Sequence, residues 1–342
     1  MKLLRPLTLA FVLVASFFFV ENVFSAEITC ERSAAGVVVK IDGRLFTEYL
    51  TKSGTKPALW PLVGPTGKPM TRDYPLRDRD GEKKDHPHQR SLWFSHGNVN
   101  GIDFWAEQGK PGTLGAIRHL KFLKIADGRP AVIVAQNAWL DPKGKKVCED
   151  ERTLRFNADD AARWIDFDIV LRATDGAVTF GDTKEGAFGV RVAESMSVDA
   201  KRGGKIVNSR GQTNDAAWGQ RAAWVDYHGP VEGQTVGIAI FNHPRSFRFP
   251  TPWHVRGYGL FAANPFGLGA FSNEKERGGA TLRPGETISL RYRVLLHRGD
   301  ERDGRVAERY AEYAEKGSCA TAGLSSSAMS TVGQANRGAL NP

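Results

Sequence analysis

Three of the chain's eight histidines, His86, His88 and His96, fall within eleven residues. A neutral imidazole can accept a proton near physiological pH or bind a metal ion. Pro87 disfavours a helix at His86, so we expect an extended segment or loop, in which side chains two residues apart can point the same way. This spacing predicts acid–base or substrate-binding histidines. The alternatives are three copper or zinc ligands with one open coordination position, and histidines that bond backbone carbonyls in a surface loop.

Carboxylates that could support these histidines lie beside them and in a second dense segment. Asp85 or Asp103 could fix the tautomer of a neighbouring imidazole. Residues 181–192 combine glycines, which permit a tight backbone, with Glu185, Arg191 and further charges. A charged turn is the alternative for this segment. We predict Asp103 and Glu185 as carboxylate partners of the histidines.

A third segment, residues 242–267, is typical of a polar ligand cleft. It holds His243, a further acid–base candidate, and the run Trp253, His254 and Arg256. An aromatic face can stack on a sugar ring while arginine or histidine binds its hydroxyls; burial in a sandwich core is the alternative for Trp253. The predicted catalytic residues are therefore His86, His88, His96, Asp103, Glu185 and His243, and the predicted substrate-binding residues are Arg72, Trp105, Arg191, Trp253, His254 and Arg256.

The elements that must position these segments are mostly strands. Asp42-Gly43 separates two apolar-rich runs, residues 37–41 and 45–50, which is a strong hairpin signal. Residues 163–173 and 287–297 alternate apolar and polar side chains, as half-buried strands of an antiparallel sheet do. Further strands are predicted at 131–140, 146–156, 222–227 and 236–241, and one short helix at 303–316.

The chain is therefore predicted to be all-β, a large antiparallel β-sandwich of two packed sheets with one short C-terminal helix. We expect a single domain over residues 27–316, because no break rich in Pro, Gly and Ser divides it. Residues 317–342 are small and polar, which predicts a disordered tail.

The first 25 residues predict a cleaved secretory signal peptide. Lys2 and Arg5 precede an apolar run of fourteen residues, 7–20, and small residues follow at the expected cleavage site after Ser25 or Ala26. Fourteen helical residues span about 21 Å, too short for a hydrocarbon core of about 30 Å. We expect a periplasmic or extracellular protein with no membrane contact beyond this segment; an uncleaved anchor is the alternative.

Composition excludes several classes of protein. The 342 residues include 41% hydrophobic and 25% charged residues, which excludes a wholly disordered chain. The net charge of +9 comes from Lys and Arg that are interleaved with Asp and Glu, so we expect no nucleic-acid partner. Of three cysteines, Cys30 and Cys148 could pair, while Cys319 lies in the tail. No Walker A loop, dinucleotide-binding glycine motif, G-x-S-x-G elbow or H-E-x-x-H helix occurs.

Five motifs over about residues 40–300 resemble the secreted PmoA family, whose members are labelled "methane oxygenase PmoA". They are GPTGKPMTRDYP, DHPHQRSLWFSHGNVNGIDFW, GDTKEGAFGVRV, WGQRAAWVDYHG and FPTPWHVRGYGLFAANPFG. Gln89 departs from the pattern, which more often has a histidine there, and this weakens any site that depends on residue 89. The membrane-bound methane monooxygenase subunit of that name is helical and polytopic, whereas this chain has one apolar run followed by strands, so we do not expect methane oxygenase activity.

The resemblance implies a β-supersandwich like that of galactose mutarotase, a fold that hosts sugar epimerases, polysaccharide lyases and hydrolase domains. Our leading hypothesis is a secreted carbohydrate-active enzyme that acts on a sugar, and Arg72, Arg191 and Arg256 favour an acidic one. It uses His and carboxylate acid–base chemistry and no cofactor. If so, His86, His88 and His243 should converge at one pocket. The alternatives are a non-catalytic carbohydrate-binding protein and a copper or zinc protein with His86, His88 and His96 as ligands.

Overall fold

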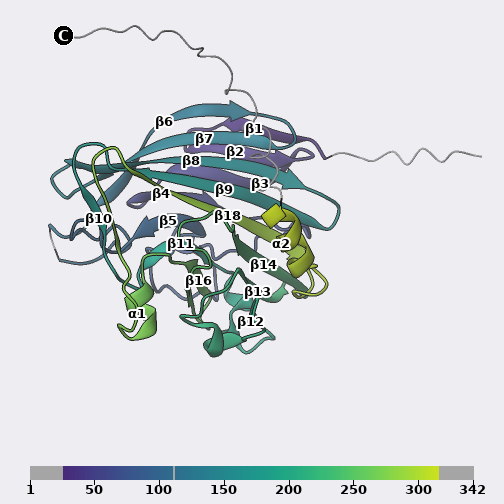
Figure 1. Cartoon of the computed structure of the whole chain (residues 1–342). Coiled ribbons are helices and arrows are strands. Elements are labelled where there is room, and N and C mark those ends of the chain that lie inside the picture. The colour runs from purple at the N-terminus through teal and green to yellow at the C-terminus, as the bar shows by residue number, and fades with distance from the viewer. Residues whose placement is uncertain (1–25, 111, 316–342) are drawn as a thin grey trace, which may run out of the picture.

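The computed structural model describes residues 26–110 and 112–315, and within them two large antiparallel sheets pack face to face (Figure 1). Neighbouring strands of the first sheet are joined by backbone hydrogen bonds and follow the spatial order β1 (Ile28–Arg32), β2 (Gly36–Ile41), β3 (Arg44–Ser53), β4 (Lys56–Trp60), β5 (Leu92–His96), β11 (Gly186–Arg191), β16 (Leu260–Ala263) and β15 (Trp253–Val255).

The second sheet is built mainly from the middle of the chain. Its order is β12 (Lys205–Asn208), β13 (Trp224–Val231), β14 (Gln234–Asn242), β18 (Thr287–Arg298), β9 (Ala162–Arg172), β8 (Lys146–Ala158), β7 (Ala131–Leu140) and β6 (Ala116–Ala126). A separate two-stranded ribbon joins β10 (Val178–Phe180) to β17 (Ala280–Leu282). The helices are α1 (Leu268–Ser272) and α2 (Val306–Glu315), with 3-10 turns at Glu194–Met196, Val198–Ala200 and Asn214–Ala217.

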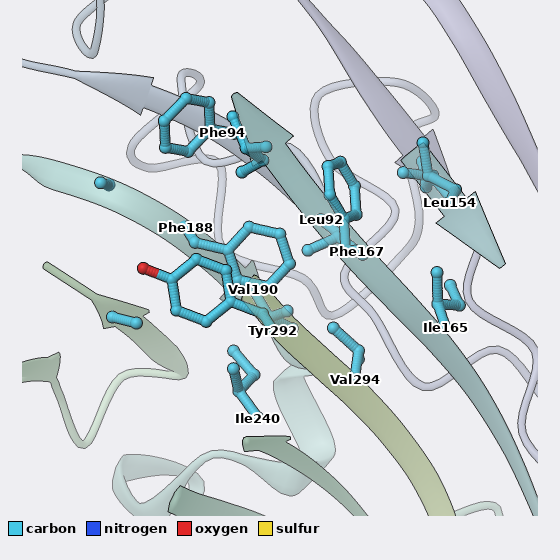
Figure 2. Packing of buried hydrophobic residues seen from close by; sticks show 14 of the residues in the cluster. Leu92, Phe94, Leu154, Ile165, Phe167, Phe188, Val190, Ile240, Tyr292 and Val294 are labelled. Carbon is cyan, nitrogen blue, oxygen red and sulfur yellow. The ribbon is translucent and has the colours of Figure 1, made fainter. Parts of the chain in front are cut away.

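The main core lies between the two sheets and is dry and aromatic (Figure 2). Phe188 of β11 stacks on Tyr292 of β18, with ring centroids 4.5 Å apart and planes 7° from parallel. Phe167 of β9 meets Phe188 edge to face at 5.0 Å. Because these rings come from both sheets, their burial fixes how the sheets face each other.

The alternating strands predicted from the sequence are confirmed. On β9, Ile165, Phe167 and Ile169 are fully buried, while Asp166 points outward and binds Arg293 of β18. The predicted hairpin is the β2–β3 pair, and the predicted C-terminal helix is α2. The prediction of a large antiparallel β-sandwich with one short C-terminal helix is therefore correct. The five-residue α1 and the strands β1, β4 to β6, β10 to β12 and β15 to β17 were not predicted.

Each sheet also carries a smaller apolar cluster on the face that points away from the main core. On the second sheet, Phe241 and Leu295 pack under Val306 and Tyr313 of α2, which Figure 1 shows lying beside β14 and β18. On the first sheet the cluster is Ala58, Trp93, Trp105, Leu260 and Ala262. The outer face of the second sheet is therefore covered by a helix, whereas loops cover that of the first.

Several sequence predictions fall wholly or partly on residues that the structure does not describe. The signal peptide, residues 1–25, and the tail, residues 317–342, lie outside the described residues. None of the helices in the described part of the chain has the length and apolar character needed to cross a membrane. Cys30 and Cys148 are both free thiols, so the suggested pairing is not present.

Candidate functional site

The candidate site lies on the outer face of the first sheet because of the alternation of its central strands. On β5, Leu92 and Phe94 point into the main core, so Trp93 points outward. On β15 and β16, His254, Leu260 and Ala262 point outward in the same way. The loops before and after β5 fold over this face and bring the dense histidine segment above it.

These residues enclose an open cavity of about 330 Å³, which we call the histidine pocket. Four separate segments of the chain contribute to it. The lining residues are His86, His88, Gln89, Asp103, Trp105, Ala106, Lys184, Glu185, His254, Arg256 and Tyr258. Seven of the twelve residues predicted to form a site therefore lie together: His86, His88, Asp103, Trp105, Glu185, His254 and Arg256.

A buried charge network holds His86 in place. The Nδ1 atom of His86 lies 3.2 Å from Asp85 Oδ1. The same carboxyl oxygen accepts hydrogen bonds from Arg72 Nη1 at 2.6 Å and from Arg191 Nη2 at 3.0 Å, and both guanidinium groups are fully buried. Burial alone would raise the pKa of Asp85, but the two arginines lower it, so the carboxylate is ionised.

Arg72 and Arg191 thus support the site from beneath and do not line the pocket. Arg72 also donates to the carbonyl of His86, and Arg191 donates to Gln89 Oε1 at 2.5 Å. Their charge is partly neutralised by Asp85, which removes two of the three arginines that had suggested an acidic sugar. Arg256 and Lys184 remain as cations at the pocket wall.

Tyr258 forms one wall of the pocket through a three-part stack. Its ring lies parallel to that of His86, with centroids 4.9 Å apart and 10° between the planes. The guanidinium of Arg191 lies over the same ring, 4.7 Å from its centroid. The Nε2 of Gln89 donates to the Tyr258 hydroxyl at 3.3 Å. Residue 89 therefore has a positioning role here as a glutamine.

His88 is held neutral beside His86. The two rings lie 5.8 Å apart, and Trp105 lies 6.1 Å from His88. Burial, and to a smaller extent the nearby Lys56 and His86, lower the pKa of His88 to about 4. The His88 ring makes no hydrogen bond within the described residues, so an uncharged imidazole is free to contact a ligand at neutral pH.

Polar groups on the pocket floor also lack partners. The ring of His254 is buried, and its Nδ1 has no hydrogen-bond partner among the described residues; the same is true of Trp105 Nε1. Burial lowers the pKa of His254 to about 4, with Arg256 and Lys184 contributing. An unpaired buried donor or acceptor costs about 1–3 kcal/mol, so these groups favour a polar ligand in the pocket.

The two predicted carboxylates differ in how free they are. Asp103 Oδ1 accepts the backbone N–H groups of Trp105 at 2.8 Å and Ala106 at 3.0 Å, so it shapes the loop that carries the indole. Glu185 is half-buried and its carboxylate lies 3.3 Å from Lys184 Nζ. Glu185 is therefore the carboxylate that can reach a ligand without breaking a backbone turn.

A buried ion-pair network supports Trp105 from the other side. Lys56 is fully buried and donates to the Trp105 carbonyl at 3.2 Å and to Glu107 Oε1 at 2.8 Å. Arg90 donates to both oxygens of Glu107. Burial lowers the pKa of Lys56, against the opposing effect of Glu107. This network fixes the loop backbone and does not reach the pocket.

Strand alternation removes two predicted residues from the pocket. His96 shares the inward face of β5 with Phe94, and its Nε2 donates to the Gly181 carbonyl at 2.8 Å. Trp253 faces the main core from β15, where its Nε1 donates to the Ala222 carbonyl. His86, His88 and His96 are therefore not assembled, and the alternative of a metal site at these three histidines is not supported.

His243 lies on the opposite side of the sandwich. It follows β14, and its ring lies 5.0 Å from Tyr313 of α2, edge to face. The predicted convergence of His243 with His86 and His88 is therefore wrong. The reason is that β14 belongs to the second sheet, a pairing that the local pattern around residue 243 does not specify.

Sequence reasoning missed Tyr258 and Lys184 as pocket residues. Both lie beside residues that were predicted, within the segments 181–192 and 242–267. A signal was present for Tyr258, which lies two residues after Arg256 in a short glycine-rich turn, but nothing marked its ring as the partner of His86.

Comparison with known proteins identifies a family without giving an activity. A family model described as "Family of unknown function (DUF6807)" matches residues 36–311. No curated protein matches the sequence. Resemblance to the PmoA family has no support from these comparisons and stays a prediction.

Among solved structures, similar folds occur in carbohydrate-active proteins. A β-arabinopyranosidase is 9% identical with a TM-score of 0.32, and the alignment covers 81% of this chain and 39% of that protein. A heparan sulfate lyase HepC mutant from Pedobacter heparinus is 10% identical with a TM-score of 0.34, covering 81% and 36%. A provisionally assigned aldose 1-epimerase from Escherichia coli K12 is 10% identical with a TM-score of 0.30, covering 80% and 100%.

This chain thus spans well under half the length of the first two structures. TM-scores of this size are too low to argue an activity or a substrate from. The residues of the histidine pocket are therefore the basis for assigning a function.

Proposed function

This chain belongs to the DUF6807 family, and we propose that it is a carbohydrate-active enzyme whose active site is the histidine pocket. One observation carries the proposal. Two adjacent imidazoles, His86 backed by Asp85 and the neutral His88, face one cavity whose walls include the rings of Trp105 and Tyr258. Acid–base groups in a polar pocket can transfer protons on a sugar. Aromatic side chains in its wall suit the less polar parts of the same ligand.

The two histidines have different roles in this proposal. His88 is unprotonated at neutral pH because its pKa lies near 4, so it accepts a proton from the sugar or from water. Asp85 orients His86 through Nδ1, which leaves the other ring nitrogen to pass a proton. Glu185 is the carboxylate that can assist from the opposite wall.

The remaining lining residues suit sugar binding. Arg256, Lys184 and His254 offer polar atoms to the oxygens of a sugar, while Trp105 and Tyr258, whose ring is already stacked on His86 with Arg191 over it, form apolar parts of the wall. A volume of about 330 Å³ is at the small end of ligand pockets, which suits one sugar residue or the end of a longer glycan.

The test is a screen of monosaccharides and oligosaccharides that reads both thermal stabilisation and product formation. His88→Gln should abolish turnover while keeping sugar affinity within a few fold. His243→Gln is the matched control, because His243 lies on the opposite side of the sandwich, and it should leave both readouts unchanged. The product identifies the reaction as epimerisation, elimination or hydrolysis.

The screen has two contrary outcomes. Sugar binding without turnover in the native protein would make it a binding protein and overturn the enzymatic role. Turnover that survives His88→Gln would remove His88 from the mechanism.

We also propose that the protein acts in the periplasm or outside the cell. The proposal rests on the leader pattern in residues 1–25. N-terminal sequencing of protein from the periplasm or medium should begin at residue 26 or 27. Recovery of the intact leader in the membrane fraction would show an uncleaved anchor instead.

A further inference from the structure

A second group of ionisable side chains lies on the outer face of the second sheet, across the sandwich from the histidine pocket. Asp226 and His228 come from β13, His297 from β18, and Glu301 from the turn that follows β18. We call these four residues the Asp226 cluster. Asp226 is fully buried, and His228 and His297 are nearly so.

The proton positions in this cluster follow from the partners. His297 Nδ1 lies 3.0 Å from the Arg298 carbonyl, which can only accept, so Nδ1 carries a hydrogen. His297 Nε2 lies 2.7 Å from Asp226 Oδ2. His297 therefore bridges the Arg298 carbonyl and the Asp226 carboxylate, with one ring nitrogen directed at each.

The other side of the cluster is incomplete. Asp226 Oδ1 lies 2.7 Å from His228 Nδ1, and Glu301 Oε2 lies 3.7 Å from the same nitrogen. Glu301 Oε2 is buried and has no hydrogen-bond partner among the described residues. Carboxylate oxygens of Asp226 and Glu301 both approach the same ring nitrogen of His228. A buried carboxylate oxygen without a partner is costly, so the arrangement favours a cation at this point.

The backbone beside the His297 ring leaves no room for a side chain at two positions. A Cβ atom at Gly237 or at Gly304 would collide with the His297 ring, so glycines on both sides let the imidazole approach Asp226. The three potential ligand atoms on Asp226, His228 and Glu301 all lie within 4.8 Å of one another. Small movements would bring all three to about 2.0–2.2 Å from one ion.

We propose that Asp226, His228 and Glu301 bind a divalent transition-metal ion, for which zinc is the natural probe. One imidazole nitrogen and two carboxylate oxygens form a donor set that zinc accepts, with a fourth position for water. Calcium prefers six to eight oxygen ligands and is not suited to this site. The ion takes the place of the proton between His228 and Asp226.

His297 is a positioning residue in this proposal. It holds Asp226 from the side opposite to the metal, the role that hydrogen-bonded partners of metal ligands commonly have. The site includes Glu301 of the turn that precedes α2, and it shares no residue with the histidine pocket. It can therefore be tested independently of the proposed sugar chemistry.

The experiment uses the full mature chain without a histidine tag, stripped with a chelator and titrated with zinc chloride by calorimetry. We expect one zinc ion per chain and a matching rise in the unfolding temperature. Cobalt added instead should give the visible absorption of a nitrogen- and oxygen-ligated ion. Zinc binding that is absent or well below one equivalent overturns the proposal. A proton between His228 and Asp226 would then be enough to stabilise the cluster.

Variants separate the site from adventitious binding. Glu301→Gln and His228→Gln should each weaken zinc binding by more than the 10- to 100-fold typical of losing a second-layer partner, and His297→Gln should fall within about that range. Glu308→Gln, an exposed carboxylate of α2, and His88→Gln in the histidine pocket should leave zinc binding unchanged.

The Glu301→Gln variant guards against a folding artefact. It removes an unpartnered carboxylate, so the metal-free variant should unfold no earlier than the metal-free native protein. If Glu301→Gln keeps native zinc affinity, or if His88→Gln loses it, the Asp226 cluster is not the site.

Discussion

The outer faces of the two sheets give histidine opposite charge states. In the histidine pocket, burial and neighbouring cations lower the pKa values of His88 and His254 to about 4, so both rings are neutral. In the Asp226 cluster, a fully buried carboxylate outweighs the effect of burial and keeps His297 charged. Burial acts on all three rings in the same direction, so the nearest charged partner decides the outcome.

Because the histidine charge states differ, the two outer faces are suited to different tasks. Neutral imidazoles beside an open cavity can exchange protons with a ligand, and the buried Arg72 and Arg191 that hold Asp85 beside His86 do not line that cavity. In the Asp226 cluster the carboxylate is enclosed and already charge-paired on one side, which suits a fixed ion. The following predictions test this contrast, beginning with the largest expected effect.

Asp226→Asn should destabilise the protein most. It removes the counter-charge of a buried imidazolium and one partner of His228, which costs about 3 kcal/mol in the free energy of unfolding. Asp168→Asn is the matched control, because Asp168 pairs with Arg155 at a half-exposed position and should cost no more than about 1 kcal/mol. Urea unfolding measures both, and equal losses would contradict the assigned importance of Asp226.

The two faces should respond to pH in opposite directions. The folded pKa values of His88 and His254 lie near 4, below the ordinary value of 6.5, so the unfolded chain binds more protons as the pH falls. Their effect is a loss of stability of up to about 1.4 kcal/mol per pH unit per residue between about 6.5 and 4. His254→Gln should flatten this acid limb.

His297 should act on the alkaline side. Its folded pKa lies above 6.5, so its stabilising contribution is fully present below pH 6.5 and is lost as the pH rises through the folded pKa. Urea unfolding between pH 4 and 9 should show that His297→Gln removes the alkaline decline and leaves the acid limb in place. If His297→Gln removed the loss of stability at acid pH and left the loss at alkaline pH, the comparison between the two faces would be contradicted.

Asp85→Asn should have a moderate effect on stability and a clear effect on the pocket. Arg72 and Arg191 lose their shared carboxylate, but Asp85 is 36% exposed, so we expect a loss of about 1–2 kcal/mol. Because Asp85 also orients His86, turnover of any sugar found by the screen should fall more than its affinity. A variant with native turnover would show that His86 needs no carboxylate.

Tyr258→Phe should have the smallest effect. It removes the hydroxyl that accepts from Gln89 and keeps the ring stacked on His86, so it should cost about 1 kcal/mol and little sugar affinity. Tyr310→Phe on the other face removes a comparable weak bond to the Asn242 carbonyl and serves as the control. Sugar affinity that falls tenfold in Tyr258→Phe alone would assign the hydroxyl to the ligand.

The fold was predictable because its signals are local. Alternation over 163–173 and 287–297 defines β9 and β18, and Asp42-Gly43 defines the β2–β3 turn. Short strands such as β15 and β16 have three and four residues, all buried, and a run of that length has no readable period. β16 forms because it pairs with β11, which is a long-range event, and β15 pairs in turn with β16.

The site was predictable only in part for the same reason. The dense segments placed His86, His88 and Asp103 together, since neighbours in a loop stay neighbours in space. His96 and Trp253 were lost because one step along a strand reverses the side-chain direction. In the Asp226 cluster only Asp226 and His228 had a local signal, their two-residue spacing on β13, and His297 and Glu301 join them only when β13, β14 and β18 pair.

The most direct test of which face is the active site is an NMR titration of the histidine ring resonances with the sugar that gives the largest thermal shift. The account predicts that His86, His88 and His254 shift in proportion to occupancy, while His228, His243 and His297 stay unchanged. Shifts confined to His228 and His297, or no histidine shift at a saturating sugar concentration, would contradict the assignment of the histidine pocket.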